Sequence, residues 1–140
     1  MAHRSGGDAS EVKSGHDIRI AHAGKDLVGE CPTWNVAEQA IYWVDTRCPS
    51  LQRLSADTLH RSWTMSTGIG SFAFRKNGGL VAGMQNGFCT IELDSGTVTS
   101  LVDPEPTMPD NRLNDGKCDN FGRFWCGSRG DILRLRREPS

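Results

Sequence analysis

Short runs of apolar residues alternate with polar, glycine-containing turns along most of the chain. The runs occupy residues 41–45, 51–54, 60–65, 71–75, 80–84, 88–93 and 97–102. The turn at 76–79 reads KNGG, which is typical of a tight β-hairpin. No segment keeps an apolar period of 3.6 residues over three turns, so no amphipathic helix is indicated. The pattern therefore predicts an all-β protein.

The spacing of these runs also predicts how the strands are grouped. Four strands joined by short turns fit between residues 71 and 102, and a strand–turn–strand pattern recurs around Trp43, Val81 and Trp125. Units of four hairpin-linked strands that repeat at about 40 residues are typical of β-propeller blades. A sandwich or a barrel is also built from short strands. We interpret the three repeats as the second and third strands of successive blades.

Length and charge narrow the class of protein. The chain has 140 residues, enough for one small domain, and a formal net charge of −1. That charge attracts neither nucleic acid nor an anionic membrane. No apolar run reaches about 18 residues, so no membrane-spanning helix is expected. The polar start of the chain lacks the apolar region of a signal peptide, and we expect residues 1–24 to form a flexible arm.

The cysteines do not form a recognisable site. There are five, an odd number, with no C-x-x-C pair and no zinc-finger spacing. Without a secretory signal, reduced thiols and a cytoplasmic location are expected. None of the four histidines is spaced to act as a base for a cysteine, so a nucleophilic thiol is not predicted.

One carboxylate, Glu30, stands in the stretch GECPTW, next to a proline-restrained backbone. Proline favours an extended conformation in the residue before it. Glu30 at the start of an inner strand would point into a central channel. An ordinary surface position for Glu30 is the other interpretation of this stretch.

The stretch NRLNDGKCDNFGRFWCG, residues 111–127, carries the densest set of polar side chains. Arg112 offers a planar fork of donors suited to oxygen-rich substrates, and Asn114 offers both a donor and an acceptor. Asp115 and the glycine after it resemble a turn, and residues 119–122 resemble a plain hairpin loop. Trp125, on the strand beyond this loop, is expected to lie in the core.

Several motifs in order resemble the gluconolactonase/regucalcin family, which includes senescence marker protein and luciferin-regenerating enzyme. The matching segments are LVGECPTW (27–34), IYWVD (41–45), GLVAG (79–83), QNGF (85–88) and NRLNDGKCDNFGRFWCG (111–127). The resemblance covers about residues 27–128 and rests on the set of motifs, of which R-x-N-D-G-K-x-D-x-x-G-R-x-W is the most specific.

The resemblance implies a partial six-bladed β-propeller with about two and a half blades present. It implies a divalent metal, calcium or zinc, and hydrolysis of sugar lactones. Glu30 would occupy the first metal-ligand position, and Arg112 and Asn114 would occupy substrate-binding positions. The family's later metal ligands, and its general base, would fall beyond residue 140, so no catalytic residue is assigned and the metal site is incomplete.

Two positions depart from the family pattern. Cys31 stands where the family commonly has glycine, a change that we do not expect to abolish metal binding. The family's third substrate contact, an acidic residue, would fall near Ile132, and the neighbouring Asp131 cannot be assigned to it. We therefore expect a propeller segment at 25–128 and a divergent tail at 129–140.

These departures and missing ligands lead to an expectation about the chain itself. We expect an N-terminal fragment of a lactone hydrolase that is inactive alone and that self-associates through open strand edges. The alternative is a non-enzymatic, calcium-binding regulatory propeller of the regucalcin kind.

Overall fold

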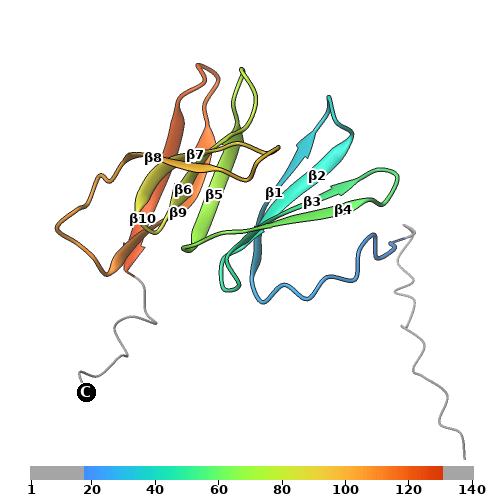
Figure 1. The fold of residues 1–140 in the computed structure, drawn as a ribbon, viewed down its shortest axis with the longest axis horizontal. Helices are drawn as coiled ribbons and strands as arrows, with labels where there is room; N and C mark the ends of the chain where they lie inside the picture. The colour runs from blue at the N-terminus through green and yellow to red at the C-terminus, as the bar shows by residue number, and fades with distance from the viewer. Residues whose placement is uncertain (1–17, 131–140) are drawn as a thin grey trace, which may run out of the picture.

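The structure, a computed structural model, describes residues 18–130; residues 1–17 and 131–140 lie outside this range. Within it the chain forms ten β-strands and no helix, which confirms the all-β prediction (Figure 1). The strands make three antiparallel sheets in chain order. Sheet one contains β1 (Gly29–Asn35), β2 (Ala40–Asp45), β3 (Ser50–Ser55) and β4 (His60–Thr64). Sheet two contains β5 (Ile69–Phe74), β6 (Leu80–Met84), β7 (Gly87–Ile91) and β8 (Val98–Val102), and sheet three contains β9 (Asn111–Cys118) and β10 (Phe124–Gly130).

The three sheets repeat one another. In sheets one and two each strand pairs with the next along the chain, and sheet three is the first hairpin of the same pattern. Trp43, Val81 and Trp125 lie on β2, β6 and β10, the second strand of each sheet. The predicted repeat is therefore confirmed, and the sheets are the blades of a partial propeller. The assignment within each blade was wrong, because the repeating units are the first and second strands of each sheet and not the second and third.

Glycine sets the tight turns between strands. Gly78 and Gly79 have φ of 92° and 67°, in the left-handed region that other residues rarely adopt. Gln85 and Asn86 form a two-residue turn between β6 and β7. Met84 and Gly87 pair on either side of this turn, and Gly87 has a φ of 105°. The KNGG and QNG turns were both predicted, and they fix the register of β6 against its neighbours.

Sheets one and two share the main hydrophobic core. Tyr42 of β2 is 1% exposed and packs on two rings of β5, with centroids 6.4 Å from Phe72 and 5.0 Å from Phe74. Trp63 of β4 stacks beside Tyr42 at 6.3 Å. Aromatic pairs at these distances gain stability beyond the area that they bury. Large side chains thus fill this interface.

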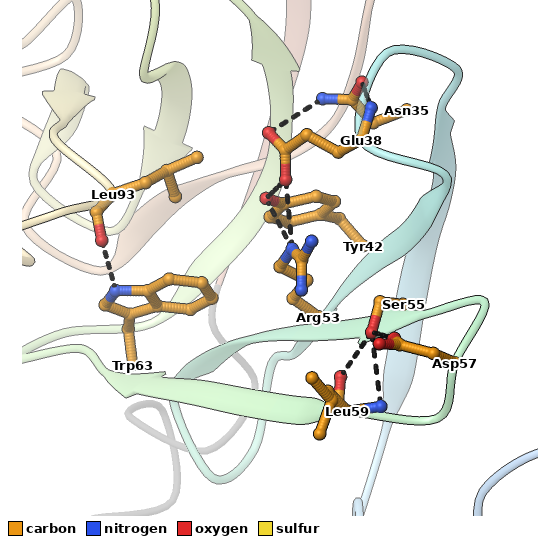
Figure 2. Close-up of polar contacts among 9 residues, drawn as sticks. All are labelled: Asn35, Glu38, Tyr42, Arg53, Ser55, Asp57, Leu59, Trp63 and Leu93. Atoms are coloured by element: carbon orange, nitrogen blue, oxygen red, sulfur yellow. Dashed lines mark hydrogen bonds and ion pairs between the residues drawn. The ribbon is translucent and has the colours of Figure 1, made fainter.

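Polar contacts line one end of the same interface, beside a pocket of about 600 Å³ between the two sheets (Figure 2). The Tyr42 hydroxyl donates a 2.7 Å hydrogen bond to Glu38, and Arg53 Nε donates to the same Glu38 oxygen at 3.0 Å and to the Tyr42 oxygen at 3.1 Å. Trp63 Nε1 donates to the Leu93 carbonyl at 2.9 Å and so ties sheet one to the end of sheet two. Burial, together with the hydrogen bond and charge of Glu38, raises the pKa of Tyr42 to about 12.

Sheets two and three approach each other through glycines. A Cβ on Gly70 would lie 2.7 Å from the carbonyl oxygens of both Leu113 and Asn114, and a Cβ on Gly116 would lie 2.8 Å from Ser71 Oγ. A Cβ on Gly83 would meet the Cys126 sulfur at 2.8 Å. These distances are shorter than real Cβ contacts, so glycine is required for this approach.

Two sequence interpretations of residues 111–125 are wrong. Asp115 and Gly116 lie within β9 and do not form a turn. Gly116 is present because Ser71 Oγ of the neighbouring sheet and the Trp125 carbonyl oxygen of β10, each 2.8 Å from where a Cβ would lie, leave no room for a side chain. Trp125 is 61% exposed and is not a core residue of the described chain. The hairpin loop at 119–122 is confirmed, closed by backbone hydrogen bonds from the Asp119 amide to the Arg123 carbonyl at 2.9 Å and from the Gly122 amide to the Asp119 carbonyl at 3.0 Å.

Candidate functional site

The first strands of the three sheets, β1, β5 and β9, lie next to one another. Gly70 of β5 touches Leu113 and Asn114 of β9, and the next β5 residue, Ser71, touches Gly116 further along β9, so these two strands run in the same direction. On the other side of β5, the Cys31 thiol of β1 lies 3.9 Å from the Phe72 carbonyl oxygen. All three strands line one pocket of about 500 Å³. The residues predicted for a site are carried by these strands.

Glu30 is the second residue of β1, opposite Val44 of β2, and its side chain is exposed. It lies at the start of a first strand, as expected. Directly after Glu30 the register with β2 shifts, and Cys31 has a φ of 55°. A glycine would adopt this left-handed conformation without strain, whereas a cysteine adopts it at a cost. The backbone beside Glu30 is therefore strained, because a non-glycine residue, Cys31, holds the left-handed conformation there.

Arg112 and Asn114 lie on β9, with β5 between them and the strand of Glu30. Arg112 Nη1 donates a 3.4 Å hydrogen bond to the Leu113 carbonyl, and the residue lines a second pocket, of about 210 Å³, with the loop at 103–109. The Asn114 side-chain oxygen is buried and has no hydrogen-bond partner. A buried acceptor without a donor is costly in free energy, so this oxygen needs a donor from a water molecule, an ion or a ligand.

The loop before β9 contributes a residue that the sequence interpretation missed. Glu105 accepts a 3.0 Å hydrogen bond from Asn111 Nδ2 and a 2.8 Å hydrogen bond from Ser128 Oγ. It thereby ties the loop to both strands of sheet three, beside Arg112. The only sequence signal was the density of prolines at positions 104, 106 and 109, which restrict the loop without indicating where Glu105 points.

Two of the cysteines, Cys89 on β7 and Cys126 on β10, have thiols that are less acidic than usual. Burial raises the pKa of the Cys89 thiol to about 11 and raises the pKa of the Cys126 thiol above its ordinary value. A thiol with a raised pKa is protonated at neutral pH and is a weak nucleophile. Neither Cys89 nor Cys126 is therefore activated as a nucleophile.

The residues between 18 and 130 do not by themselves fit a divalent metal. In this range no group of three or more His, Cys, Asp or Glu side chains is arranged to hold one. Glu30 offers a single carboxylate, whereas a hard divalent cation takes about six or more oxygen ligands. The expected site near Ile132, and the neighbouring Asp131, lie outside the described residues.

Several known proteins are similar to this chain in sequence and in fold. The chain is 31% identical over 121 residues to 6-deoxy-6-sulfogluconolactonase of Pseudomonas putida, covering 80% of this chain and 42% of that protein. It is 35% identical over 108 residues to regucalcin of Xenopus laevis, covering 76% of this chain and 36% of that protein. The structure of luciferin-regenerating enzyme superposes with a TM-score of 0.74 at 26% identity, covering 81% of this chain and 39% of that chain.

These matches cover only part of each relative, and the relatives and the matching family model indicate the same family. The chain spans about two fifths of the length of the relatives named above. In the described part of the chain, no helix is long and apolar enough to cross a membrane. Residues 28–136 match the family described as the SMP-30/Gluconolactonase/LRE-like region. The chain therefore belongs to the SMP-30/gluconolactonase/LRE-like family.

Proposed function

We propose that this chain supplies the substrate-holding side of a sugar lactone hydrolase. The observation that carries the proposal is the buried, unpartnered Asn114 oxygen on the strand that also carries Arg112. The relatives named as lactonases support the same class of substrate. Cyclic sugar esters present several hydroxyl and carbonyl oxygens, which suit a guanidinium fork beside an amide.

Arg112 and Asn114 act by binding and orienting the lactone. Arg112 donates to substrate oxygens, and the Asn114 Oδ1 accepts from a sugar hydroxyl, so that the buried acceptor gains its missing donor. In the hydrolysis itself a water oxygen bonds to the acyl carbon and the ring C–O bond breaks. A base takes a proton from the water and passes it to the departing ring oxygen, which leaves as a hydroxyl. Holding the ring in one orientation is the contribution of these two residues.

The remaining parts of the reaction lie outside the described residues. Glu30 would be one ligand of a calcium or zinc ion, with the other ligands and the general base supplied by residues beyond the described range. We therefore infer that the 140-residue chain alone does not hydrolyse lactones. Its exposed Trp34 and Trp125, 49% and 61% accessible, favour self-association of the isolated chain. A cytoplasmic location remains part of the proposal.

A chimera tests the site residues directly. Residues 28–128 would replace the matching segment of L-arabinolactonase of Azospirillum brasilense, which is 34% identical over 109 residues. We expect the chimera to hydrolyse lactones. Arg112→Ala or Asn114→Ala in the chimera should lower kcat/KM by about 100-fold. Glu30→Gln should lower the metal content measured by mass spectrometry.

Matched controls remove the same groups elsewhere. Arg47→Ala deletes a guanidinium from the β2–β3 turn, and Asn120→Ala deletes an amide from the β9–β10 loop. Both should leave kcat/KM within about twofold of the chimera. A folded chimera in which the Arg112 and Asn114 variants stay fully active would overturn the assignment, and metal-dependent hydrolysis by the 140-residue chain alone would overturn the inferred inactivity.

The second candidate is a non-enzymatic, calcium-binding regulatory role. The match to a protein named regucalcin, at 35% identity, favours it. A folded chimera that binds calcium through Glu30 but hydrolyses no sugar lactone would support this role over catalysis.

A further inference from the structure

The loop that joins β8 to β9, residues 103–110, lies where β9 begins and β10 ends (Figure 1). Its backbone is held by its own hydrogen bonds. The Met108 amide donates to the Glu105 carbonyl, and the Asn111 amide donates to the Met108 carbonyl, both at 2.9 Å. Three prolines also restrict φ in this loop. The position of the Glu105 backbone is therefore set independently of its side chain.

The half-buried Glu105 side chain connects the two strands of sheet three. One carboxylate oxygen accepts a 3.0 Å hydrogen bond from Asn111 Nδ2 on β9. The other accepts a 2.8 Å hydrogen bond from Ser128 Oγ on β10. These two partners lie on either side of a directly opposed pair, Arg112 and Arg129. A single carboxylate thus holds both strands at the level of Arg112.

The hairpin is weak at this level for two reasons. Like charges on directly opposite residues of neighbouring strands destabilise the pairing, and Arg112 is opposite Arg129. The backbone ladder is also interrupted nearby, because the register shifts between Cys126 and Ser128. The strands therefore need another connection here. The Glu105 carboxylate supplies it, together with a negative charge at the level of the two cations.

We propose that Glu105 is the positioning residue for Arg112 in lactone binding. This inference rests on the proposed function of Arg112 and extends it to a residue of the preceding loop. Both Glu105 oxygens are engaged by the hairpin, so Glu105 acts through Arg112 and not on the substrate. By holding the start of β9 against β10, it keeps the guanidinium where the substrate oxygens meet it, which lowers the entropy cost of binding.

Positioning of Arg112 is measurable without a ligand. Nuclear magnetic relaxation of its Nε–H group in the full 140-residue chain gives an order parameter. Glu105→Ala removes both side-chain hydrogen bonds and leaves those of the loop backbone, so this order parameter should fall to below about 0.6. Glu105→Gln should keep the wild-type value, because its amide accepts from Asn111 Nδ2 and donates to Ser128 Oγ.

A matched control removes a carboxylate from another sheet. Glu92→Ala deletes the partner of Arg75, 3.0 Å away in sheet two, and should leave the order parameter of Arg112 unchanged. An order parameter at Arg112 that is the same in Glu105→Ala as in the wild type would overturn the proposal. An equal fall in Glu92→Ala would overturn it too, because the effect would then come from a general loosening of the chain.

Binding of a stable lactone analogue tests the role in recognition. The probe is gluconolactam, in which an N–H replaces the ring oxygen of the lactone, and chemical-shift titration of the full chain gives its Kd. Glu105→Ala should raise this Kd by about tenfold, and Glu105→Gln should keep it within about twofold of the wild type. In an Arg112→Ala chain, Glu105→Ala should have no further effect, whereas a merely structural role would weaken binding equally in both backgrounds.

The two proposals fail in different ways. If the wild type binds gluconolactam and Arg112→Ala weakens binding but Glu105→Ala does not, the positioning role is overturned and the proposed function stands. A folded wild-type chain that does not bind gluconolactam would overturn the proposed function, and with it this role of Glu105, even where the order parameter of Arg112 falls.

Discussion

Sheet two packs against sheet one through large side chains and against sheet three through glycines. On the first side Tyr42 meets Phe72 and Phe74, and the space between the backbones is filled by rings. On the second side a Cβ at Gly70 would lie 2.7 Å from backbone oxygens of β9. Side chains can repack, whereas two backbones in contact cannot. The glycine interface is therefore the one that fixes position, and it fixes the strand that carries Arg112 and Asn114.

The largest effect is expected when the glycine interface is broken. Gly70→Ala should lower the free energy of unfolding by about 3 kcal/mol, because the new methyl group overlaps carbonyl oxygens that have no room to move. Urea titration followed by circular dichroism measures it. Gly68→Ala is the control, since its Cβ would meet atoms no closer than 4.0 Å. A small effect at Gly70 would mean that β9 moves away freely, and the contrast between interfaces would be lost.

Removing a polar group from the interface between sheets one and two should lower the free energy of unfolding by less than Gly70→Ala does. Tyr42→Phe removes the hydroxyl that Glu38 and Arg53 share, at a cost of about 2 kcal/mol because both partners are charged. Urea titration again gives the value. Arg75→Ala removes a partly exposed pair with Glu92 and should cost less than about 1 kcal/mol. An equal loss of unfolding free energy in Tyr42→Phe and Arg75→Ala would show that the hydrogen bonds of Tyr42 stabilise the fold no more than an exposed ion pair does.

The same tyrosine predicts a pH dependence. Its pKa of about 12 in the folded chain lies above the ordinary value of 10.0, so the neutral phenol is favoured by folding. The contribution is complete below about pH 10 and is lost as the pH rises through about 12. Because the chain has one tyrosine, absorbance at the tyrosinate band reports this group alone. A midpoint near 10 in the folded chain would contradict the buried contacts of Tyr42.

Replacing one ring by a smaller apolar side chain tests how far the aromatic interface can repack. Phe72→Leu should cost about 1 kcal/mol, because the neighbouring rings of Tyr42 and Phe74 can close much of the space. The thermal midpoint and the urea midpoint both measure it. A cost near that of Gly70→Ala would mean that both interfaces are equally rigid.

The smallest effect concerns the strained residue beside Glu30. Cys31→Gly should raise the free energy of unfolding by up to about 1 kcal/mol, because glycine adopts a φ of 55° without strain. Cys48→Gly, in an exposed turn, serves as the control and should show no gain. Destabilisation by Cys31→Gly would indicate that the thiol contact with Phe72 outweighs the strain.

Most of the strands were predictable because their signals are local. The KNGG and QNG turns determine the hairpins of sheet two, and alternation identifies β2 and β6. β9 was misinterpreted because Asn, Asp and Gly favour turns when neighbours are ignored. Gly116 belongs there for a contact with Ser71, which is distant in sequence. The exposure of Trp125 and the two contacts of Glu105 likewise depend on what lies beside them in space, and no local pattern carries that information.

The division into sheets has a consequence for cooperativity. Each backbone ladder stays within one sheet, and Trp63, Arg61 and Cys31 donate hydrogen bonds to sheet two through their side chains. The stability of such a molecule approaches a sum of sheet terms and nearest-neighbour interface terms, as in a one-dimensional array. Of the described sheets, sheet two has a neighbour on each side and should be the last to open. A destabilised interface would therefore detach an outer sheet while the middle one stays folded.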